Sequence, residues 1–436
     1  MKFVITSDTH FGDDSCALVA KNNEGVIERG CKYNAFKDAV KPNPETENNY
    51  LILAGDIFDF SIASYKKAYE YGRAFFNFIK EDKIAKEIIY IAGNHDADMW
   101  HIVQHQRNVI NRLLNGDIPQ NFEHSIAGII DDRKNSKKKG FWLNNVKAKD
   151  KAKDKDNDKA DNSKYGGMFL DYIMGKDNRV TFNFAYPNLY IVTDNESVLV
   201  THGQYLEPYW SLLGEFAIKI AYDDLQVGEV DIEEMVEMNF PLNQLACTGL
   251  GQAGVLTNVV RQVQLDVKNN KLSRVGKYMN RLEKVIDEMT DYGWLKEMIV
   301  DYLLKKAKEE ILNTVGGIEK ARYSEEFIYK KEVQKRFRNF YQASLLEIGA
   351  INENSQKEKA PGFNIPAPWR IIFGHTHQPI SWNEKNPPKL DTVSSASPRR
   401  LTLHNTGGWL KENGGFCGAE VFTYETKAGF SSVSIR

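Results

Sequence analysis

A chain of 436 residues with an apolar fraction of 42 % can form one large domain with an insertion, or two or three ordinary domains. Its formal net charge of −2 excludes a global basic field that would attract nucleic acid, although a local basic groove remains compatible with this sum. The four cysteines form no C-x-x-C pair, which argues against thiolate metal sites and favours a reducing compartment.

Short apolar runs rich in Val and Ile recur along the chain, and each ends in polar residues. The first three cover residues 3–6, 51–54 and 88–92, and two later ones cover 198–200 and 371–373. Runs of this length predict buried strands, and segment 65–86, between the second and third runs, has a helical pattern. Strand, helix and strand in this order predict an α/β fold whose sheet is buried on both faces.

Two segments interrupt this pattern. Residues 147–164 consist almost entirely of Lys, Asp, Ala and Asn, so we predict a flexible, solvated loop there. Residues 205–367 have a mostly helical pattern, with a further helix over 324–346 that is expected to end at Gly349. We therefore expect a core of residues 1–204 plus 368–436 and a helical insert over 205–367.

An apolar stripe runs along one predicted helix of the insert. Its members recur at steps of three and four: Leu272, Val275, Met279, Leu282, Ile286 and Met289. We expect this stripe to pack against neighbouring helices, because a stripe needs only a core to bury it. No segment approaches the roughly 18 consecutive apolar residues of a membrane span, and the first residues enter a strand-like run without a secretory signal. A cytoplasmic protein without a membrane span is expected.

Polar residues that can bind metal ions stand at the carboxyl ends of all five apolar runs, where ligands of α/β sheets bind. They are Asp8, His10, Asp56, Asp59, Asn94, His95, Asp96, His202, His375 and His377. Because residues i and i+2 of a strand point to the same side, Asp8 with His10 is expected to aim at one point, as is His375 with His377. Carboxylate, imidazole and amide oxygen together suit Mn, Fe, Zn or Ni. Each piece alone is usually structural, but five together favour a metal site.

Five segments resemble, in order, the five motifs of the calcineurin-like metallophosphoesterases. They are Asp8-Thr9-His10, Gly55-Asp56-Ile57-Phe58-Asp59, Gly93-Asn94-His95-Asp96, Thr201-His202-Gly203 and Gly374-His375-Thr376-His377. The resemblance covers about residues 1–110, 190–204 and 368–410. It implies a sandwich of two mixed sheets flanked by helices, here with a large, mostly α-helical insertion. It also implies hydrolysis at phosphorus, without specifying the substrate.

The resemblance implies two divalent transition-metal ions, with Mn, Fe or Zn as candidates. Asp8, His10 and His377 would bind one ion, and Asn94, His202 and His375 would bind the other. Asp56 would bridge both, since a shared carboxylate offsets the repulsion between two dications about 3.5–4 Å apart. Such ions lower the pKa of bound water, so that a metal-bound hydroxide can act as the nucleophile near neutral pH.

Three further motif residues are catalytic candidates. His95 resembles the family's non-ligand histidine, which contacts the phosphate and helps to protonate the leaving oxygen, a role that suits a pKa near neutrality. Asp59 and Asp96 are candidates for orienting His95 or for supporting the nearby backbone, and the sequence does not distinguish between these roles.

Three other histidines remain without an assigned role. His101 and His105 are spaced i, i+4 and could line the pocket, but packing or solvent-facing roles are favoured because no third ligand is apparent nearby. His404 precedes the turn Asn405-Thr406-Gly407, which resembles the terminal turn of many family members. A structural role is expected for His404, although it could reach the site.

The leading interpretation is a metal-dependent hydrolase of phosphate esters, with a small-molecule, nucleotide or pyrophosphate-type substrate. A nuclease that acts on DNA ranks second, because the insert mixes many acidic residues with its basic ones: Arg274, Lys277, Arg281 and Lys284. A non-catalytic protein-binding scaffold is a remote third interpretation, since every ligand position is filled. The oligomeric state is not indicated.

The position of the insert suggests that it caps the site. It leaves the core just after His202 and returns before His375, so both of its ends should lie near the metal ions. Side chains of residues 204–210 should then lie closest to the substrate, with Tyr205, Tyr209 and Trp210 as candidates for contact. The alternative is that the insert forms an assembly surface that faces away from the site.

Overall fold

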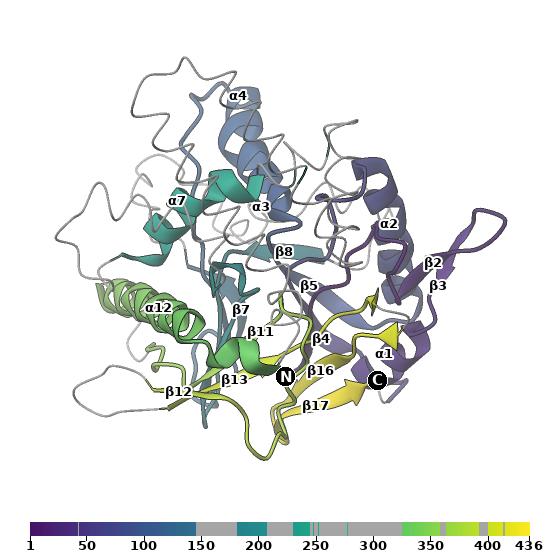
Figure 1. Cartoon of the computed structure of the whole chain (residues 1–436). Coiled ribbons are helices and arrows are strands. Elements are labelled where there is room, and N and C mark those ends of the chain that lie inside the picture. Colours follow the sequence, from purple (N-terminus) through teal and green to yellow (C-terminus); the bar gives the residue numbers. More distant parts are fainter. Residues whose placement is uncertain are drawn as a thin grey trace.

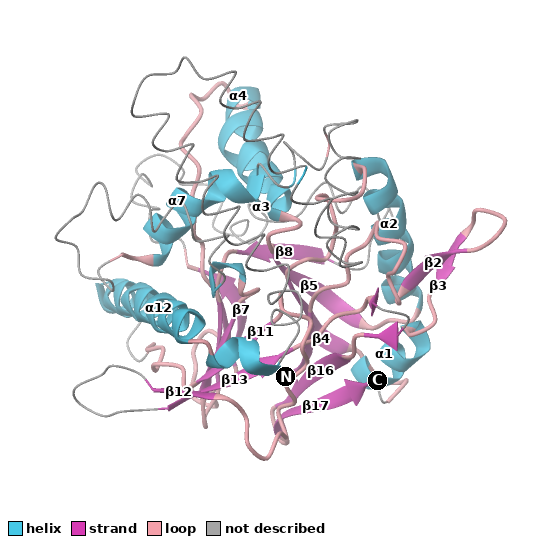
Figure 2. Cartoon of the chain, in the orientation of Figure 1, coloured by secondary structure: helices cyan, strands magenta, loops and turns pink. Residues whose placement is uncertain are grey.

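The computed structural model describes residues 1–41, 43–144, 181–206, 230–244, 247, 252, 277, 325–357, 363–391, 400–412 and 415–436. Two large β-sheets form the centre of the molecule, and helices lie on their outer sides (Figure 1). The expectation of a mixed α/β fold with more than one mixed sheet is confirmed (Figure 2). Both chain ends lie at the same end of the molecule (Figure 1).

Within the described residues, the first sheet has the strand order β17-β16-β1-β4-β5-β8. The bounds of these strands, in the same order, are Gly429–Ile435, Ala419–Glu425, Lys2–Thr6, Asn48–Ala54, Ala85–Ile91 and Thr181–Ala185. Strands β1, β4, β5 and β8 are parallel, and β16 pairs with β1 in the antiparallel sense. The first three apolar runs are therefore strands, as predicted.

The second sheet has the order β12-β13-β11-β10-β9-β6-β7 within the described residues. The bounds, in this order, are Lys389–Asp391, Arg400–Asn405, Arg370–Phe373, Ser197–Val200, Leu189–Val192, Gly128–Asp131 and Gly140–Leu143. β10 and β11 are parallel neighbours, so the two later apolar runs lie side by side although the whole insert separates them in the sequence. Two short ribbons complete the strands: β2 (Val19–Lys21) with β3 (Ile27–Arg29), and β14 (Lys411–Glu412) with β15 (Gly415–Phe416).

Aromatic side chains pack the sheets against each other and against the helices beside them. Tyr50 of β4 lies 6.3 Å from Phe141 of β7, measured between ring centroids, and thus joins the two sheets. Phe36 of α1 (Tyr33–Val40) lies 5.7 Å from Phe75 of α2 (Tyr65–Glu81), and both rings are fully buried. Full burial of such a side chain contributes roughly 1.5–3 kcal/mol. The helix predicted over 65–86 ends at Glu81 instead, because the chain turns at residues 82–84 before it enters β5.

The remaining helical segments lie mainly along the second sheet and above the strand ends (Figure 1). Their bounds are α3 Ala97–His105, η1 Gln106–Asn111, α4 Arg112–Leu114, η4 Gln204–Leu206, α7 Ile232–Gln244, η6 Glu325–Tyr329 and α12 Lys331–Lys357. The predicted helix end at Gly349 is wrong, since α12 continues past it. Ile351 is buried there, and the Asn352 side chain bonds both the N–H and the carbonyl of Ile365.

Much of the predicted insert lies outside the described residues, as do all six residues of the apolar stripe and the loop over 147–164. A mostly helical insert therefore stays a prediction, to which η4, α7, η6 and α12 contribute. Of the helices that the structure describes, none has the length and hydropathy that a membrane span requires.

A polar network fastens α12 to the second sheet. The Glu347 carboxylate accepts hydrogen bonds from Tyr190 Oη at 2.6 Å, Asn188 Nδ2 at 3.0 Å and Ser125 Oγ at 2.8 Å. Tyr190 and Asn188 are fully buried, and burial raises the pKa of Glu347 above its usual range. Removal of the carboxylate would leave Tyr190 and Asn188 with longer hydrogen bonds only, those to each other and to Ser344 at 3.1–3.3 Å. Hydrogen bonds to a charged acceptor contribute about 1.5–3 kcal/mol each.

We therefore predict that Glu347→Leu lowers the free energy of unfolding by about 2–4 kcal/mol, and that Glu347→Gln lowers it less because one acceptor oxygen remains. Urea denaturation followed by tryptophan fluorescence measures both values. Gln342→Leu is the matched control, because Gln342 is exposed on the same helix. Equal effects of Glu347→Leu and Gln342→Leu would contradict a role of the network in docking α12.

Candidate metal centre

The predicted ligands lie in the loops that follow the strands, and their backbone conformation is unusual. Among the described residues, six non-glycine residues have a positive φ angle, and five of these are predicted ligands: Asp8 (53°), His10 (49°), Asp56 (52°), His375 (67°) and His377 (54°). Such a conformation costs on the order of 1–3 kcal/mol for each residue, so the surrounding structure must hold these loops firmly.

The predicted cause of convergence, alternation along a strand, is wrong. β1 ends at Thr6 and β11 ends at Phe373, so the ligand pairs stand beyond the strands. Left-handed turns at alternate residues, rather than the pleat of a strand, place the ligand side chains. Asp8 and His10 fall in one cluster, whereas His375 and His377 fall in different clusters, so the expectation that His375 and His377 aim at one point is wrong as well.

Two glycines of the motifs permit the close approach of ligand side chains. Gly55 has a φ of +92°, and a Cβ atom at this position would overlap the ring of His202. A Cβ atom at Gly374 would overlap the carboxylate of Asp8 and the hydroxyl of Ser7. Any larger residue at either position would therefore displace a ligand.

The first cluster contains Asp8, His10 and His377, whose ligand atoms all lie within 4.8 Å of one another. The Nε2 atoms of His10 and His377 are 3.1 Å apart, and His377 Nε2 lies 3.3 Å from Asp8 Oδ1. All three side chains are buried. Two imidazole nitrogens and a carboxylate that converge in this way offer three ligands to one metal ion.

The second cluster contains Asp56, His202 and His375 at the same mutual spacing. His202 Nε2 lies 3.2 Å from Asp56 Oδ2 and 3.2 Å from Asn94 Oδ1, so Asn94 belongs to this group. His202 Nδ1 donates to the carbonyl of Ala54 at 2.9 Å, which turns Nε2 toward the cluster. Asp56 Oδ2 also lies 3.8 Å from His10 Nε2 and thus faces both clusters.

The ionised carboxylates of the two clusters favour the binding of cations. Burial raises the pKa of Asp8 and Asp56, but the neighbouring histidines outweigh it, so both pKa values fall below the usual range. Burial lowers the pKa of His202, but Asp56 and Asp8 outweigh it and raise this pKa to about 9. The buried carboxylates thus attract positive charge, and the nitrogen and oxygen donors around them suit divalent transition metals. The residues therefore fit a metal centre.

Residues 1–209 match the family model of the calcineurin-like phosphoesterases. The resemblance to this family is thus confirmed over residues 1–209. A comparison with curated proteins found no match. Enzymes of this phosphoesterase family are metal-dependent, which agrees with the two clusters. The match ends before His375 and His377, so the inclusion of these two residues in the metal centre depends on the geometry described above.

Asp59 connects the first cluster to His95. Its Oδ2 lies 2.9 Å from His10 Nδ1, and its Oδ1 lies 2.9 Å from His95 Nδ1. Burial raises the pKa of Asp59, but His95 and His10 outweigh it and hold this pKa far below its usual range. The His95 side chain is 20 % exposed, whereas that of Asp59 is 2 % exposed. His95 therefore stands at the edge of the centre, where a substrate can reach it, and Asp59 orients it from behind.

Asp96 has a different place. It accepts hydrogen bonds from the backbone N–H groups of Ile57 at 2.8 Å and Gly93 at 2.6 Å, and from the Tyr90 hydroxyl. Burial and the neighbouring Asp56 carboxylate raise the pKa of Asp96 to about 6. The sequence left two roles open. Asp59 bonds His95 and orients it, and Asp96 supports the backbone of the ligand loops.

Ser61 was not among the predicted site residues. Its hydroxyl lies 2.7 Å from Asp59 Oδ1 and 2.7 Å from His95 Nδ1. The only sequence signal is its position two residues after Asp59, a spacing that also occurs in ordinary turns. Gln252 and Cys247, which contact the same loops, gave no local signal, because they lie far away in the insert.

The other candidates lie away from the metal centre or are buried in packing. His101 and His105 pack against Phe122, with ring centroids 5.2 Å from it in both cases, which agrees with the favoured packing role. Tyr205 is buried, with its hydroxyl 2.7 Å from that of Tyr186, and its contact with a substrate stays a prediction. Tyr209 and Trp210 lie outside the described residues.

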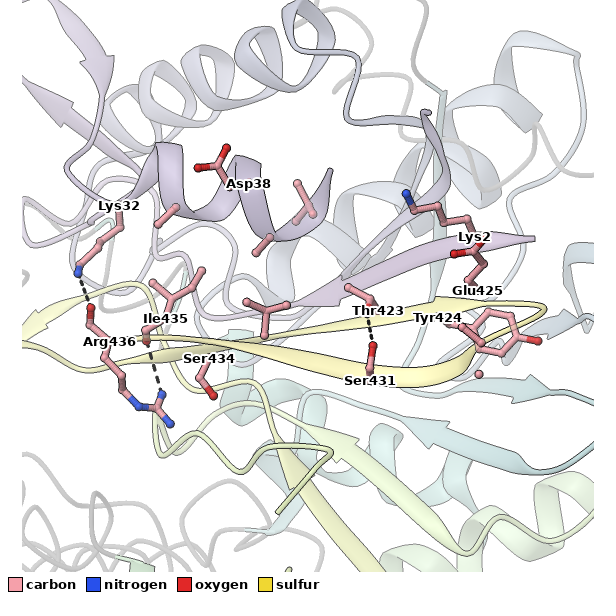
Figure 3. Close-up of a pocket in the computed structure, with 16 residues that line it drawn as sticks. Lys2, Lys32, Asp38, Thr423, Tyr424, Glu425, Ser431, Ser434, Ile435 and Arg436 are labelled. Atoms are coloured by element: carbon pink, nitrogen blue, oxygen red, sulfur yellow. Dashed lines mark hydrogen bonds between the residues drawn. The ribbon is translucent and has the colours of Figure 1, made fainter. Parts of the chain in front are cut away.

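An open pocket between α1 and the strands β16 and β17 is not part of this centre (Figure 3). Its polar lining includes Lys2, Lys32, Asp38, Glu425 and Arg436. The lining contains none of the residues of the two clusters, so we assign it no catalytic role.

His404 is structural, as expected. Its ring stacks on Trp382 at 4.6 Å, Nδ1 lies 3.1 Å from the carbonyl of Ser381, and Nε2 lies 3.4 Å from Nη1 of Arg370. Burial and the nearby Arg370 lower the pKa of His404 to about 4, so the folded protein holds a neutral imidazole at neutral pH.

This pKa generates a prediction about acid stability. Between about pH 6.5 and pH 4 the unfolded chain binds a proton at His404 that the folded chain does not, so the free energy of unfolding falls as the pH falls through this window. The protonation of His404 lowers the free energy of unfolding by at most about 3 kcal/mol. In His404→Gln the decrease between pH 7.5 and pH 4.5 should be smaller by about 1–3 kcal/mol. Urea titrations at both pH values measure it.

The matched control for this prediction is His105→Gln, because His105 is exposed. This variant should retain the wild-type loss of stability in acid. If His404→Gln loses as much stability between the two pH values as the wild type does, then His404 does not titrate on unfolding in the way described.

Proposed function

We propose that the protein is a metal-dependent hydrolase of phosphate esters that works with two divalent transition-metal ions. The observation that carries the proposal is the position of Asp56, whose Oδ2 lies 3.2 Å from His202 Nε2 in one cluster and 3.8 Å from His10 Nε2 in the other. One carboxylate that faces two sets of imidazoles is what a shared ligand between two cations requires. Mn, Fe and Zn all suit the donors.

In this proposal some side chains bind the metal ions and others transfer the proton. Asp8, His10 and His377 would hold one ion, Asn94, His202 and His375 the other, and Asp56 both. Once bound, the ions would supply Lewis acidity toward the phosphoryl group and would activate water. Asp59 keeps the Nδ1–H of His95 directed inward, at 2.9 Å, so that Nε2 can carry the proton that the leaving oxygen needs.

We propose that the substrate is a small molecule, a nucleotide or a pyrophosphate, that the insert over 205–367 caps the site, and that the enzyme acts in the cytoplasm. The cap is supported by α7, whose Phe240 ring lies 6.2 Å from His101 of α3, the helix that follows His95. The four free cysteines agree with a reducing compartment.

A screen of phosphomonoesters, phosphodiesters, pyrophosphates and single-stranded DNA with added Mn²⁺ tests the substrate class. Preferred cleavage of DNA would replace the small-molecule proposal by that of a nuclease.

Asp56→Ala tests the shared ligand. The variant should retain less than one metal ion per chain where the wild type retains close to two, and it should lose hydrolysis of an aryl phosphate, because both sites lose a ligand. Elemental analysis of the purified proteins measures the metal content. Asp117→Ala, which removes an exposed carboxylate, is the matched control and should behave as the wild type. Full activity of the wild type in a strong chelator would reject the proposal.

His95→Ala separates metal binding from proton transfer. Because the His95 ring bonds Asp59 and Ser61 and is not assigned to either ion in this proposal, the variant should keep the wild-type metal content. Its kcat should fall by about 10²–10⁴-fold, and most for aryl phosphates with poor leaving groups, which depend most on protonation. Steady-state kinetics over a series of leaving groups provides the measurement. A metal-free His95→Ala protein would instead identify His95 as a ligand.

A further inference from the structure

The side-chain amide of Gln252 spans the loop that follows Asp59. Its Nε2 donates to the carbonyl of Phe60 at 2.8 Å and to that of Ala63 at 2.9 Å, and its Oε1 accepts from the N–H of Tyr65 at 3.2 Å. Both donor hydrogens and the acceptor oxygen of one amide thus bind one short stretch of backbone. Gln252 belongs to the residues 205–367, whereas this stretch belongs to the phosphoesterase core.

The bonded stretch includes the residue that touches His95. Ser61 lies between Phe60 and Ala63, the two residues whose carbonyls Gln252 holds. The Ser61 hydroxyl has one proton, which it donates to the Asp59 carboxylate at 2.7 Å, and its oxygen can then accept from His95 Nδ1–H at 2.7 Å. The backbone of the same stretch also bonds His95, since the Phe60 N–H donates to the carbonyl of His95 at 3.1 Å.

A second side chain from the same part of the chain holds the other loop of the site. Cys247 is fully buried, and its Sγ lies 2.9 Å from the carbonyl oxygen of Asn94, to which it donates. That carbonyl belongs to the peptide that joins Asn94 to His95. Gln252 and Cys247 therefore fasten the two loops between which the imidazole of His95 is held.

We propose that Gln252 is a positioning residue for the hydrolytic reaction. By fixing the carbonyls on both sides of Ser61, it holds the Ser61 hydroxyl and the Asp59 carboxylate against His95 Nδ1, and so directs Nε2 toward the leaving oxygen. The proposal rests on the proposed function, because only the protonation of a leaving group requires this orientation. It makes the insert a part of the catalytic arrangement, in addition to any role as a cap.

The chain provides a matched control in Gln244. This glutamine also lies in the insert, and its Nε2 lies 2.6 Å from Nδ1 of a core histidine, His101. Gln244→Ala and Gln252→Ala therefore each remove one amide that joins the insert to the core. Only Gln252 contacts the loop that carries Ser61.

The kinetic experiment compares these variants at full metal loading on a series of aryl phosphates. Gln252→Ala should lower kcat about tenfold or more, as is typical of residues that orient an active-site histidine, with little change in KM. The loss should grow as the leaving group becomes poorer. In the His95→Ala background the same substitution should have almost no effect, because its target is gone. An equal loss with and without His95, or a wild-type dependence on the leaving group, would overturn the proposal.

A spectroscopic experiment tests the positioning without any turnover. In protein labelled with ¹⁵N at histidine, Gln252→Ala should shift the ring nitrogen signals of His95 and leave those of His101 unchanged, and Gln244→Ala should do the reverse. Unchanged His95 signals in Gln252→Ala would overturn the proposal. If the wild type hydrolyses no phosphate ester but the His95 signals shift as described, the proposed function fails and the structural coupling stands. If Gln252→Ala does not fold, Gln252→Met keeps the length of the side chain and removes its hydrogen bonds.

Discussion

The burial of three carboxylates, those of Asp8, Asp56 and Asp59, within one group of imidazoles is the constraint on which the rest of the site depends. An ionised carboxylate loses several kcal/mol of solvation on burial, and the neighbouring charges must offset this loss. Histidines hold the pKa values of all three carboxyl groups below their usual range, so the three are ionised. The left-handed backbone of five ligands is tolerated because it places compensating groups beside these charges.

Both sheets are needed to satisfy this constraint. The loops after β1, β4 and β5 of the first sheet bring Asp8, Asp56 and Asn94, and the loops after β10 and β11 of the second sheet bring His202 and His375. Backbone hydrogen bonds join the loops directly, including those from Asp8 N–H to the carbonyl of Gly55 and from Gly374 N–H to the carbonyl of His202, both at 2.9 Å. Neither sheet alone surrounds the carboxylates, so the metal centre exists only where the two sheets meet.

The sequence predicted those parts of the structure that depend on local pattern. The five apolar runs are strands because each is short, rich in Val and Ile, and followed by polar residues. The ligand residues could be identified because each closes such a run. The cause of their convergence could not be predicted, since a positive φ at Asp8 or His375 leaves no trace in the amino-acid composition. Ser61 and Gln252 were missed because their partners are set by tertiary contacts, and α12 passes Gly349 because packing outweighs the low helix propensity of glycine.

The order of the motifs explains how an insert can affect the chemistry. β10 and β11 are adjacent parallel strands, and parallel neighbours always need a long connection. Here the connection starts after His202 and ends before His375, so its two ends are fixed beside the metal centre. Its docking contacts on the core, such as those of Cys247 and Gln252, then fall on the loops nearest to these ends. Because those loops also carry Asp59, His95 and Asn94, the docking of the insert is coupled directly to the residues of the site.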